Sequence, residues 1–286
     1  MSDVDELRLC TAIEAMRAGR VIPYLGPDAL ALEPDAQVPA SPEALAEFLT
    51  ARVAVPHKIR KRLTQAAQFI ENFKHRKTLV SAMNAAFAAT PEPSELHWAI
   101  AAAAAPLIID AWYDDSMAAA LRTELGEEGW GQIQAVSQSE RSGSWTACYD
   151  AHGAAVASVD PSWHTLLYRP LGAHLPAGNY LVSDSDFVEV LTEIDIQTPI
   201  PAAVQALRRG RSFLYLGCRF NDQLTRSFAR QIAKRSSDLH WAVLPEEPTR
   251  MEARFLEEQN IERIVLPLGS VAAHLHAAFL RAAIAA

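Results

Sequence analysis

Acidic residues gather behind a short apolar run in the first half of the chain. Residues 107–109 are apolar, and Asp110, Asp114 and Asp115 follow closely. If a buried strand delivers these carboxyl groups to a crevice, one of them can act as a general acid or base once its pKa is shifted toward neutrality. The alternative is that they cap the next helix or face water. Only a pocket that holds them would favour the chemical interpretation.

A turn near the N-terminus is the second place where the sequence indicates ligand chemistry. The apolar run Val21–Leu25 ends at Gly26, and Pro27 and Asp28 come next. In open α/β sheets, ligands bind outside the carboxyl ends of the strands, where backbone N–H groups approach phosphate. Pro27 removes one N–H group, and the carboxylate of Asp28 repels phosphate. The turn therefore predicts a crevice but a poor pyrophosphate site.

Cysteine and histidine spacing argues against a metal centre. Cys10, Cys148 and Cys218 are far apart and odd in number, so they form neither a disulfide framework nor a paired zinc motif. Cys218 has no adjacent base, which favours a buried structural thiol over a nucleophile. His274 and His276 are two positions apart on an expected helix and point to different faces. We expect no bound metal.

Composition sets the broad class. Half of the residues are hydrophobic, which suffices for a substantial core, and the formal charge of -8 gives no general reason to bind nucleic acid. The N-terminus is acidic where a secretory signal is basic, and the apolar runs are too short to span a membrane. We expect a cytoplasmic protein. The basic residues 74–77 are interpreted as a solvated helix junction.

The elements that would position these residues alternate along the chain. Strands are expected at Val21–Leu25, 107–109, 180–182, Ser212–Leu216, 241–244 and 264–266, and helices at 7–16, 42–53, 58–88, 95–105, 117–125, 187–191, 201–208, 223–234, 249–259 and from 270 onward. Such alternation predicts an α/β fold: a doubly wound, mostly parallel Rossmann-like sheet with helices on both faces. Residues 126–161 contain a hairpin signal and are interpreted as a small β insertion within a single domain, 1–286.

Four stretches resemble the SIR2-like family, the sirtuin-related NAD-processing domains found largely in bacteria. Residues 26–30 stand where the family has Gly-Ala-Gly-x-Ser, and residues 110–114 where it has Thr-Thr-Asn-Tyr-Asp, so Trp112 replaces Asn. Residues 169–172 stand where the family has Lys-x-His-Gly, so Leu171 replaces His. The strand that ends at 217, with a later helix-capping Asp, also matches.

The resemblance implies NAD or ADP-ribose as cofactor. It places the cofactor at these positions: Gly26, Asp28, Ala29, Trp112, Gly217, Cys218 and Asp222. Because the family's Asn and His are replaced, the remaining catalytic candidates are Asp110, Asp114 and His174. His174 also reads as an ordinary loop histidine, and His97 as a helix histidine.

The leading hypothesis is a pseudoenzyme that has lost NAD cleavage and serves as a regulatory, ligand-sensing or interaction module. The alternative is an active NAD hydrolase or ADP-ribosyl-transferring enzyme with relocated catalytic acids. A zinc-independent protein deacylase is a weaker alternative, since the sirtuin zinc module needs four paired cysteines. The expected partner is a protein or a small nucleotide, with no nucleic acid and no membrane. A homo-oligomeric structural protein stays open.

Overall fold

A nine-stranded central sheet organises the computed structural model, which describes residues 3–137, 143, 145–193 and 200–283. The strand order among these residues is β11-β10-β9-β1-β2-β6-β3-β4-β5, and all neighbours are parallel except β3–β4 and β4–β5. The bounds are β1 Val21–Leu25, β2 Leu107–Asp110, β3 Trp130–Ala135, β4 Thr146–Asp150, β5 Ala155–Val156, β6 Thr165–Arg169, β9 Ser212–Leu216, β10 His240–Val243 and β11 Ile261–Ile264. The predicted mostly parallel α/β sheet is confirmed.

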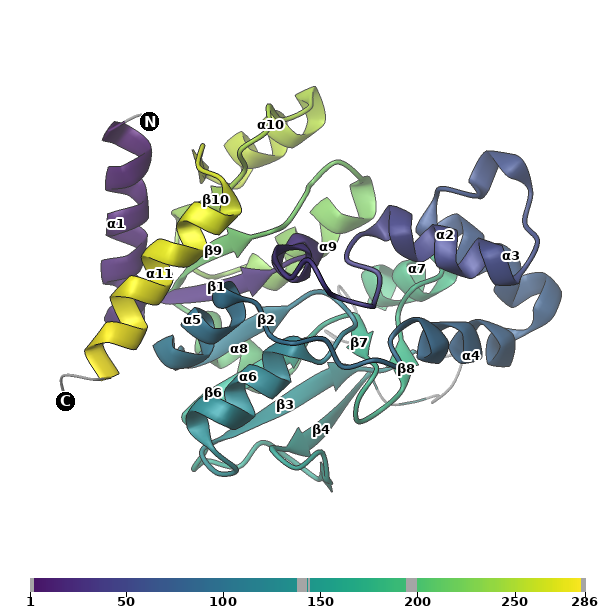
Figure 1. Ribbon diagram of the computed structural model, residues 1–286, viewed down its shortest axis with the longest axis horizontal. Coiled ribbons are helices and arrows are strands. Elements are labelled where there is room, and N and C mark those ends of the chain that lie inside the picture. Colours follow the sequence, from purple (N-terminus) through teal and green to yellow (C-terminus); the bar gives the residue numbers. More distant parts are fainter. Residues whose placement is uncertain (1–2, 138–142, 144, 194–199, 284–286) are drawn as a thin grey trace.

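Helices cover both faces of this sheet (Figure 1). One face carries α1 Asp3–Arg17, α5 Glu95–Ala103, α6 Ser116–Leu125 and α11 Leu268–Ala283, and the other carries α8 Ala202–Arg208, α9 Gln223–Ala233 and α10 Arg250–Glu258. Successive strand residues alternate between the two cores: Leu25 and Ile108 face the first, and Tyr24 and Ile109 face the second. Because both faces are buried, strands such as β1 read as continuous apolar runs.

A helical lobe, defined as α2 Pro42–Arg52, α3 Leu63–Lys74 and α4 Arg76–Ala86, projects beside the sheet (Figure 1). Its core joins Leu45, Ile70 and Met83 to Trp112 and Tyr113 from the loop after β2. The short helices η1 Pro27–Leu32 and η2 His57–Ile59 precede α2 and α3, and α7 Asp184–Glu193 lies against α3. The lobe therefore stands over the carboxyl ends of the strands.

Several predicted elements differ from the structure. The expected helix over 58–88 divides into η2, α3 and α4, because His75 adopts a left-handed φ of 70° between the last two. Residues 180–182 are no strand of the main sheet: β8 Asn179–Tyr180 pairs antiparallel with β7 Gly172–Ala173 in a separate small sheet. The last strand lies at Ile261–Ile264, earlier than expected.

Two central strands, β3 and β6, escaped prediction because they contain polar residues that are nevertheless buried. In β3, Gln132 and Gln134 hydrogen-bond to each other, with Nε2 of Gln134 donating at 2.9 Å. In β6, Thr165 and Arg169 are buried at the two ends of an apolar run. The hairpin β4–β5 within 126–161 was anticipated, and it extends the edge of the central sheet.

The length and apolar content of the described helices decide whether any of them could cross a membrane. Within the described ranges, no helix combines the length and apolar character that crossing a bilayer requires. Arg76, interpreted as part of a solvated junction, is instead largely buried and pairs with Asp186.

Candidate functional site

A cleft opens where the carboxyl ends of β1, β2 and β9 meet the helical lobe. β1 pairs in parallel with β2 on one side and with β9 on the other, so the strand order reverses at this point, as it does at ligand crevices of open α/β sheets. The cleft has a volume of about 770 Å³. That size lies within the range of small-molecule sites, which is roughly 300–1,000 Å³. We refer to it below as the cleft.

The structure brings most of the proposed cofactor positions to the cleft. The positions that line it are Gly26, Asp28, Trp112, Cys218 and Asp222, together with Leu171, which the sequence resemblance aligns with the family's His. Ala29 and Gly217 pack directly behind the lining. The three catalytic candidates Asp110, Asp114 and His174 are not part of the lining.

The turn after β1 has its backbone donors occupied within the protein. The N–H of Asp28 donates to the carbonyl of Gly217 at 3.1 Å, and the N–H of Ala29 donates to that of Gly26 at 3.1 Å. The N–H of Gly26 donates to the backbone carbonyl of Leu216, the last residue of β9, at 2.9 Å, and Pro27 has no N–H. A phosphate at this turn would find no backbone donor from residues 26–29.

Gly26 and Gly217 are required by the contact between two turns. A Cβ atom at Gly26 would lie 2.3 Å from the carbonyl oxygen of Gly217, and one at Gly217 would lie 2.6 Å from the nitrogen of Ala29. Gly217 also has a φ of +68°, which disfavours other residues. These glycines therefore serve packing between the β1 and β9 turns, and no ligand is needed to explain them.

The sheet side of the cleft is acidic. Burial raises the pKa of Asp28, and Arg219 opposes that shift. Arg219 is itself paired, with its Nη1 2.5 Å from Glu246 Oε2 and its Nε 3.4 Å from Glu252 Oε1. Asp222 caps α9 by accepting from two backbone N–H groups. This wall therefore has no unpaired cation among its described residues.

Trp112, which the sequence resemblance aligns with the family's Asn, is almost entirely buried. Its indole is 3% exposed and donates from Nε1 to the carbonyl of Pro39 at 2.9 Å. It packs edge-on against Phe87, with ring centroids 6.2 Å apart, and against Tyr113 at 5.0 Å. Trp112 thus holds the helical lobe to the sheet and offers no free donor to a ligand.

A buried charge cluster lies below the cleft, which we call the Arg169 network. Arg169 is fully buried; its Nη1 lies 2.9 Å from Asp115 Oδ1, and its Nε lies 3.6 Å from Asp110 Oδ2. Its Nη2 donates to the backbone carbonyl of Asp114. Asp110 ends β2 and Arg169 ends the parallel neighbour β6, so the register places them side by side.

Protonation within the Arg169 network is set by burial. Burial raises the pKa of Asp110 to about 8, against the opposing effect of Arg169. The pKa of Asp115 is also raised by burial. Asp114 accepts the N–H of Ser116 at 2.9 Å and so caps the start of α6. The expectation that some of these acids face water is wrong, because all three are buried; the capping interpretation holds for Asp114.

The histidine candidates have structural surroundings. His174 lies in the turn between β7 and β8, with its Nδ1 3.2 Å from the hydroxyl of Tyr180. His97 is buried in α5, and its Nδ1 accepts the N–H of Ser94 at 3.1 Å. Burial lowers the pKa of His97. Neither histidine lines the cleft, and no histidine occurs among its described lining residues.

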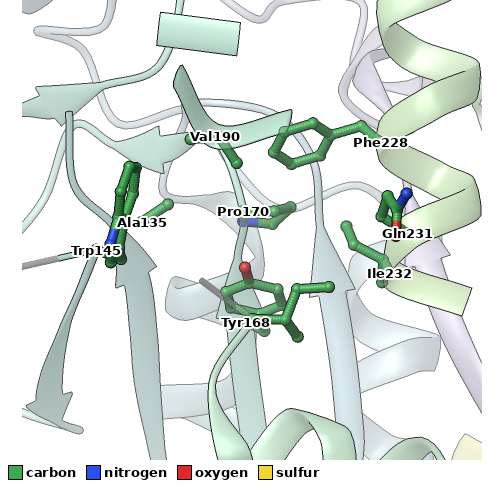
Figure 2. A pocket seen from close by; sticks show the side chains of 9 residues that line it. Ala135, Trp145, Tyr168, Pro170, Val190, Phe228, Gln231 and Ile232 are labelled. Carbon is green, nitrogen blue, oxygen red and sulfur yellow. The ribbon is translucent and has the colours of Figure 1, made fainter. Parts of the chain in front are cut away.

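A small second cavity, the Cys218 thiol and metal coordination are the other features that bear on chemistry. Figure 2 shows Tyr168, Pro170 and Phe228 around a second cavity behind β6. Its volume is about 10 Å³, room for roughly one water molecule. Burial raises the pKa of the Cys218 thiol, so this residue is a weak nucleophile. Across the described part of the chain, no group of three or more His, Cys, Asp or Glu side chains is arranged to hold a metal ion.

Sequence reasoning missed two features of this site. It placed Arg169 at the family's Lys position but did not connect it to the acids after β2; a single Arg closing an apolar strand was the available signal. It also left out the segment Lys61–Gln65, which lines the cleft from the helical lobe. The basic run that includes Lys61 and Arg62 could have drawn attention to that segment.

Comparison with protein families gives one match. A family model described as SIR2-like domain matches residues 106–264, which is more than half of the chain. The matched region runs from β2 to β11 and contains the β2 and β9 sides of the cleft. The helical lobe and the β1 turn precede it. A comparison with curated proteins gave no match.

Proposed function

Because the chain belongs to the SIR2-like domain family, an NAD-related family, we propose that it is a regulatory nucleotide-binding module that has lost NAD cleavage. One observation supports this proposal: the cleft is in place and is lined by Trp112 and Leu171, the residues that the sequence resemblance aligns with the family's Asn and His. An indole committed to a backbone carbonyl cannot orient water or ribose, and a leucine cannot accept a proton.

The carboxyl groups nearby are poor replacements. Asp110 and Asp115 are held by Arg169 beneath the cleft, and Asp114 caps α6. A general base must come within hydrogen-bond reach of the proton that it removes, and these groups do not line the cleft. Asp222 does line it, but its Oδ1 already accepts from Leu224 and Thr225 N–H at 2.7 and 3.1 Å.

The ligand class that we propose is NAD or ADP-ribose, bound without chemistry and without a metal. A bound nucleotide would bridge the sheet and the helical lobe, because residues of both line the cleft. Occupancy of the cleft would then be transmitted to a partner protein in the cytoplasm through the position of the lobe. This makes the lobe the moving element of the proposed sensor.

Calorimetric titration with NAD and with ADP-ribose, followed by assay of released nicotinamide, tests the proposal. We expect both ligands to bind and nicotinamide to stay at the level of a protein-free control. Sustained release of nicotinamide that requires the protein would contradict it. A Gly217→Val variant, in which a side chain would collide with the β1 turn, serves as a control with a disrupted cleft.

An active NAD hydrolase is a second candidate, favoured by the protonation state of Asp110. An acid with a pKa of about 8 could protonate or deprotonate groups at neutral pH. Burial raises the pKa of Tyr24 and Cys218, both of which line the cleft, and Asp110 is close enough to add a smaller contribution to each. In this case Asp110→Asn would abolish nicotinamide release, while Asp160→Asn, which changes an acid on an exposed loop, would retain it.

A further inference from the structure

The two walls of the cleft differ in charge. Opposite the acidic sheet wall, Lys61 and Arg62 line the cleft from the helical lobe with exposed side chains, and Glu43 of α2 is the acidic residue that the lobe adds to the lining. Within the described residues, no carboxylate lies within 4.0 Å of either cation; Arg62 Nη1 contacts only the amide oxygen of Gln65 at 3.4 Å. They belong to the basic segment 57–62, although the whole chain has a formal charge of -8.

The first turn of α3 adds backbone donors to this wall. α3 begins at Leu63, and the side chain of Arg62 makes no capping hydrogen bond. The first helical N–H, from Ala66, donates to the Arg62 carbonyl at 2.8 Å, so the N–H groups of residues 63–65 precede the helical ladder. Residues 63–65 also line the cleft. By contrast, α2 and α9, which also begin at the cleft, are capped by Ser41 and Asp222.

The β1 turn lacks the hydrogen-bond donors that a phosphate needs. The donors of the β1 turn are used within the protein, Pro27 has none, and the carboxylate of Asp28 faces the cleft. A phosphate oxygen there would meet negative charge in a half-enclosed space, where repulsion is screened less than in bulk water. A phosphate group in the cleft is therefore expected to bind at the opposite wall, which the helical lobe forms.

We propose that the cleft binds the phosphate groups of a nucleoside diphosphate ligand through Lys61, Arg62 and the first turn of α3, and not through the β1 turn. The inference rests on the proposed function, since it assumes that the cleft holds a nucleotide. Two cations and a helix N-terminus together favour a doubly charged group. The uncharged nucleoside part then lies toward Phe187, Phe228 and Leu224, the apolar lining between the walls.

The test is a calorimetric titration of the full chain with ADP-ribose and, separately, with pyrophosphate. The variant is Lys61→Ala/Arg62→Ala. The matched control is Lys58→Ala/Arg60→Ala, which removes the same charge from the same exposed segment but outside the cleft lining. We expect the first variant to lose about tenfold or more in affinity for both probes, and the control to change by less than about twofold. Thermal melting should be the same for both, because the side chains are exposed.

Three results would overturn the proposal. The Lys61→Ala/Arg62→Ala variant could bind as tightly as the parent, both double variants could lose affinity equally through general electrostatics, or the parent could bind neither probe. Asp28→Asn sharpens the test, because binding through the opposite wall predicts equal or tighter binding in this variant. Nicotinamide release is scored separately: its appearance would refute the proposed function and leave the position of the phosphate site to the affinity data.

Discussion

Two buried arginine–aspartate clusters of the molecule differ in the charge state of their central carboxyl group. In the one that fastens α4 to α7, Asp186 Oδ2 accepts from Arg76 Nη1 at 2.8 Å and from the backbone of Val182 and Ser183 at 2.9 Å. Its Oδ1 accepts from the hydroxyl of Ser137 at 2.7 Å. Burial alone would raise the pKa of Asp186, but Arg76 and these hydrogen bonds lower it.

The Arg169 network has an arginine too, yet its central acid is neutral. Asp110 accepts one backbone N–H, from Trp112, and shares Arg169 with Asp114 and Asp115. Burial therefore dominates and raises the pKa of Asp110 to about 8. The comparison teaches that the number of donors on a buried carboxylate, more than the presence of an arginine, decides whether it stays charged.

Replacing Asp186, the charged acid, should give the largest loss in the free energy of unfolding. Asp186→Ala leaves the buried guanidinium of Arg76 with Glu71 as its carboxylate partner. Breaking one partner of a buried pair costs about 3–5 kcal/mol, so we expect the free energy of unfolding to fall by that amount in urea titrations. Asp184→Ala, on the first turn of the same helix, should cost less than about 1 kcal/mol. Equal losses in the two variants would contradict a stabilising charged pair between Asp186 and Arg76.

Replacing Asp110, the neutral acid, should change how the free energy of unfolding depends on pH. Folded protein keeps the Asp110 proton up to a pH of about 8, while the unfolded chain loses it near its ordinary pKa of 3.8. Folding therefore takes up a proton in this window, and this group makes stability fall as pH rises, by at most about 1.4 kcal/mol per pH unit. Asp110→Asn should remove that part of the slope in unfolding measured from pH 5 to pH 9. An unchanged slope would mean that Asp110 is ionised.

The smallest effect is expected from a single donor. Ser137→Ala removes one hydrogen bond to the charged carboxylate of Asp186, at a cost of about 1–2 kcal/mol at neutral pH. Since the depressed pKa of Asp186 stabilises the fold above the unfolded pKa and is lost in acid, the variant should also unfold at a higher pH on acidification. Circular dichroism during an acid titration measures this shift, and an unchanged midpoint would contradict it.

The fold was predictable where burial and sequence agree. Strands such as Val21–Leu25 and Ser212–Leu216 are covered on both faces and read as apolar runs. β3 and β6 were missed because Gln134 and Arg169 are buried with hydrogen-bond partners that are distant in sequence, Leu175 for Gln134 and Asp115 for Arg169. Periodicity carries no information about such partners. The break at His75 was hidden for a similar reason, since a left-handed residue leaves the helical pattern on both sides intact.

The site was predictable in outline. Glycine turns and strand ends located the cleft walls at Gly26, Trp112 and Cys218. Two properties depend on tertiary structure and could not be derived: the donors of the β1 turn are occupied by β9, and Asp110 is paired below the cleft. The role of Lys61 also required the fold, because only the packing of the helical lobe places it across from Asp28.

The interlocked turns change how sequence variation in this family should be read. Gly26 and Gly217 exclude side chains from each other's turns, so a substitution at either needs a compensating backbone shift at the other. A lineage that stops using NAD gains no freedom to drift at these positions. Invariance of both glycines among relatives would record the contact between β1 and β9 and would be no evidence of a retained cofactor. Correlated changes at residues 61, 62 and 28 among relatives would say more about the ligand of the cleft than the two glycines do.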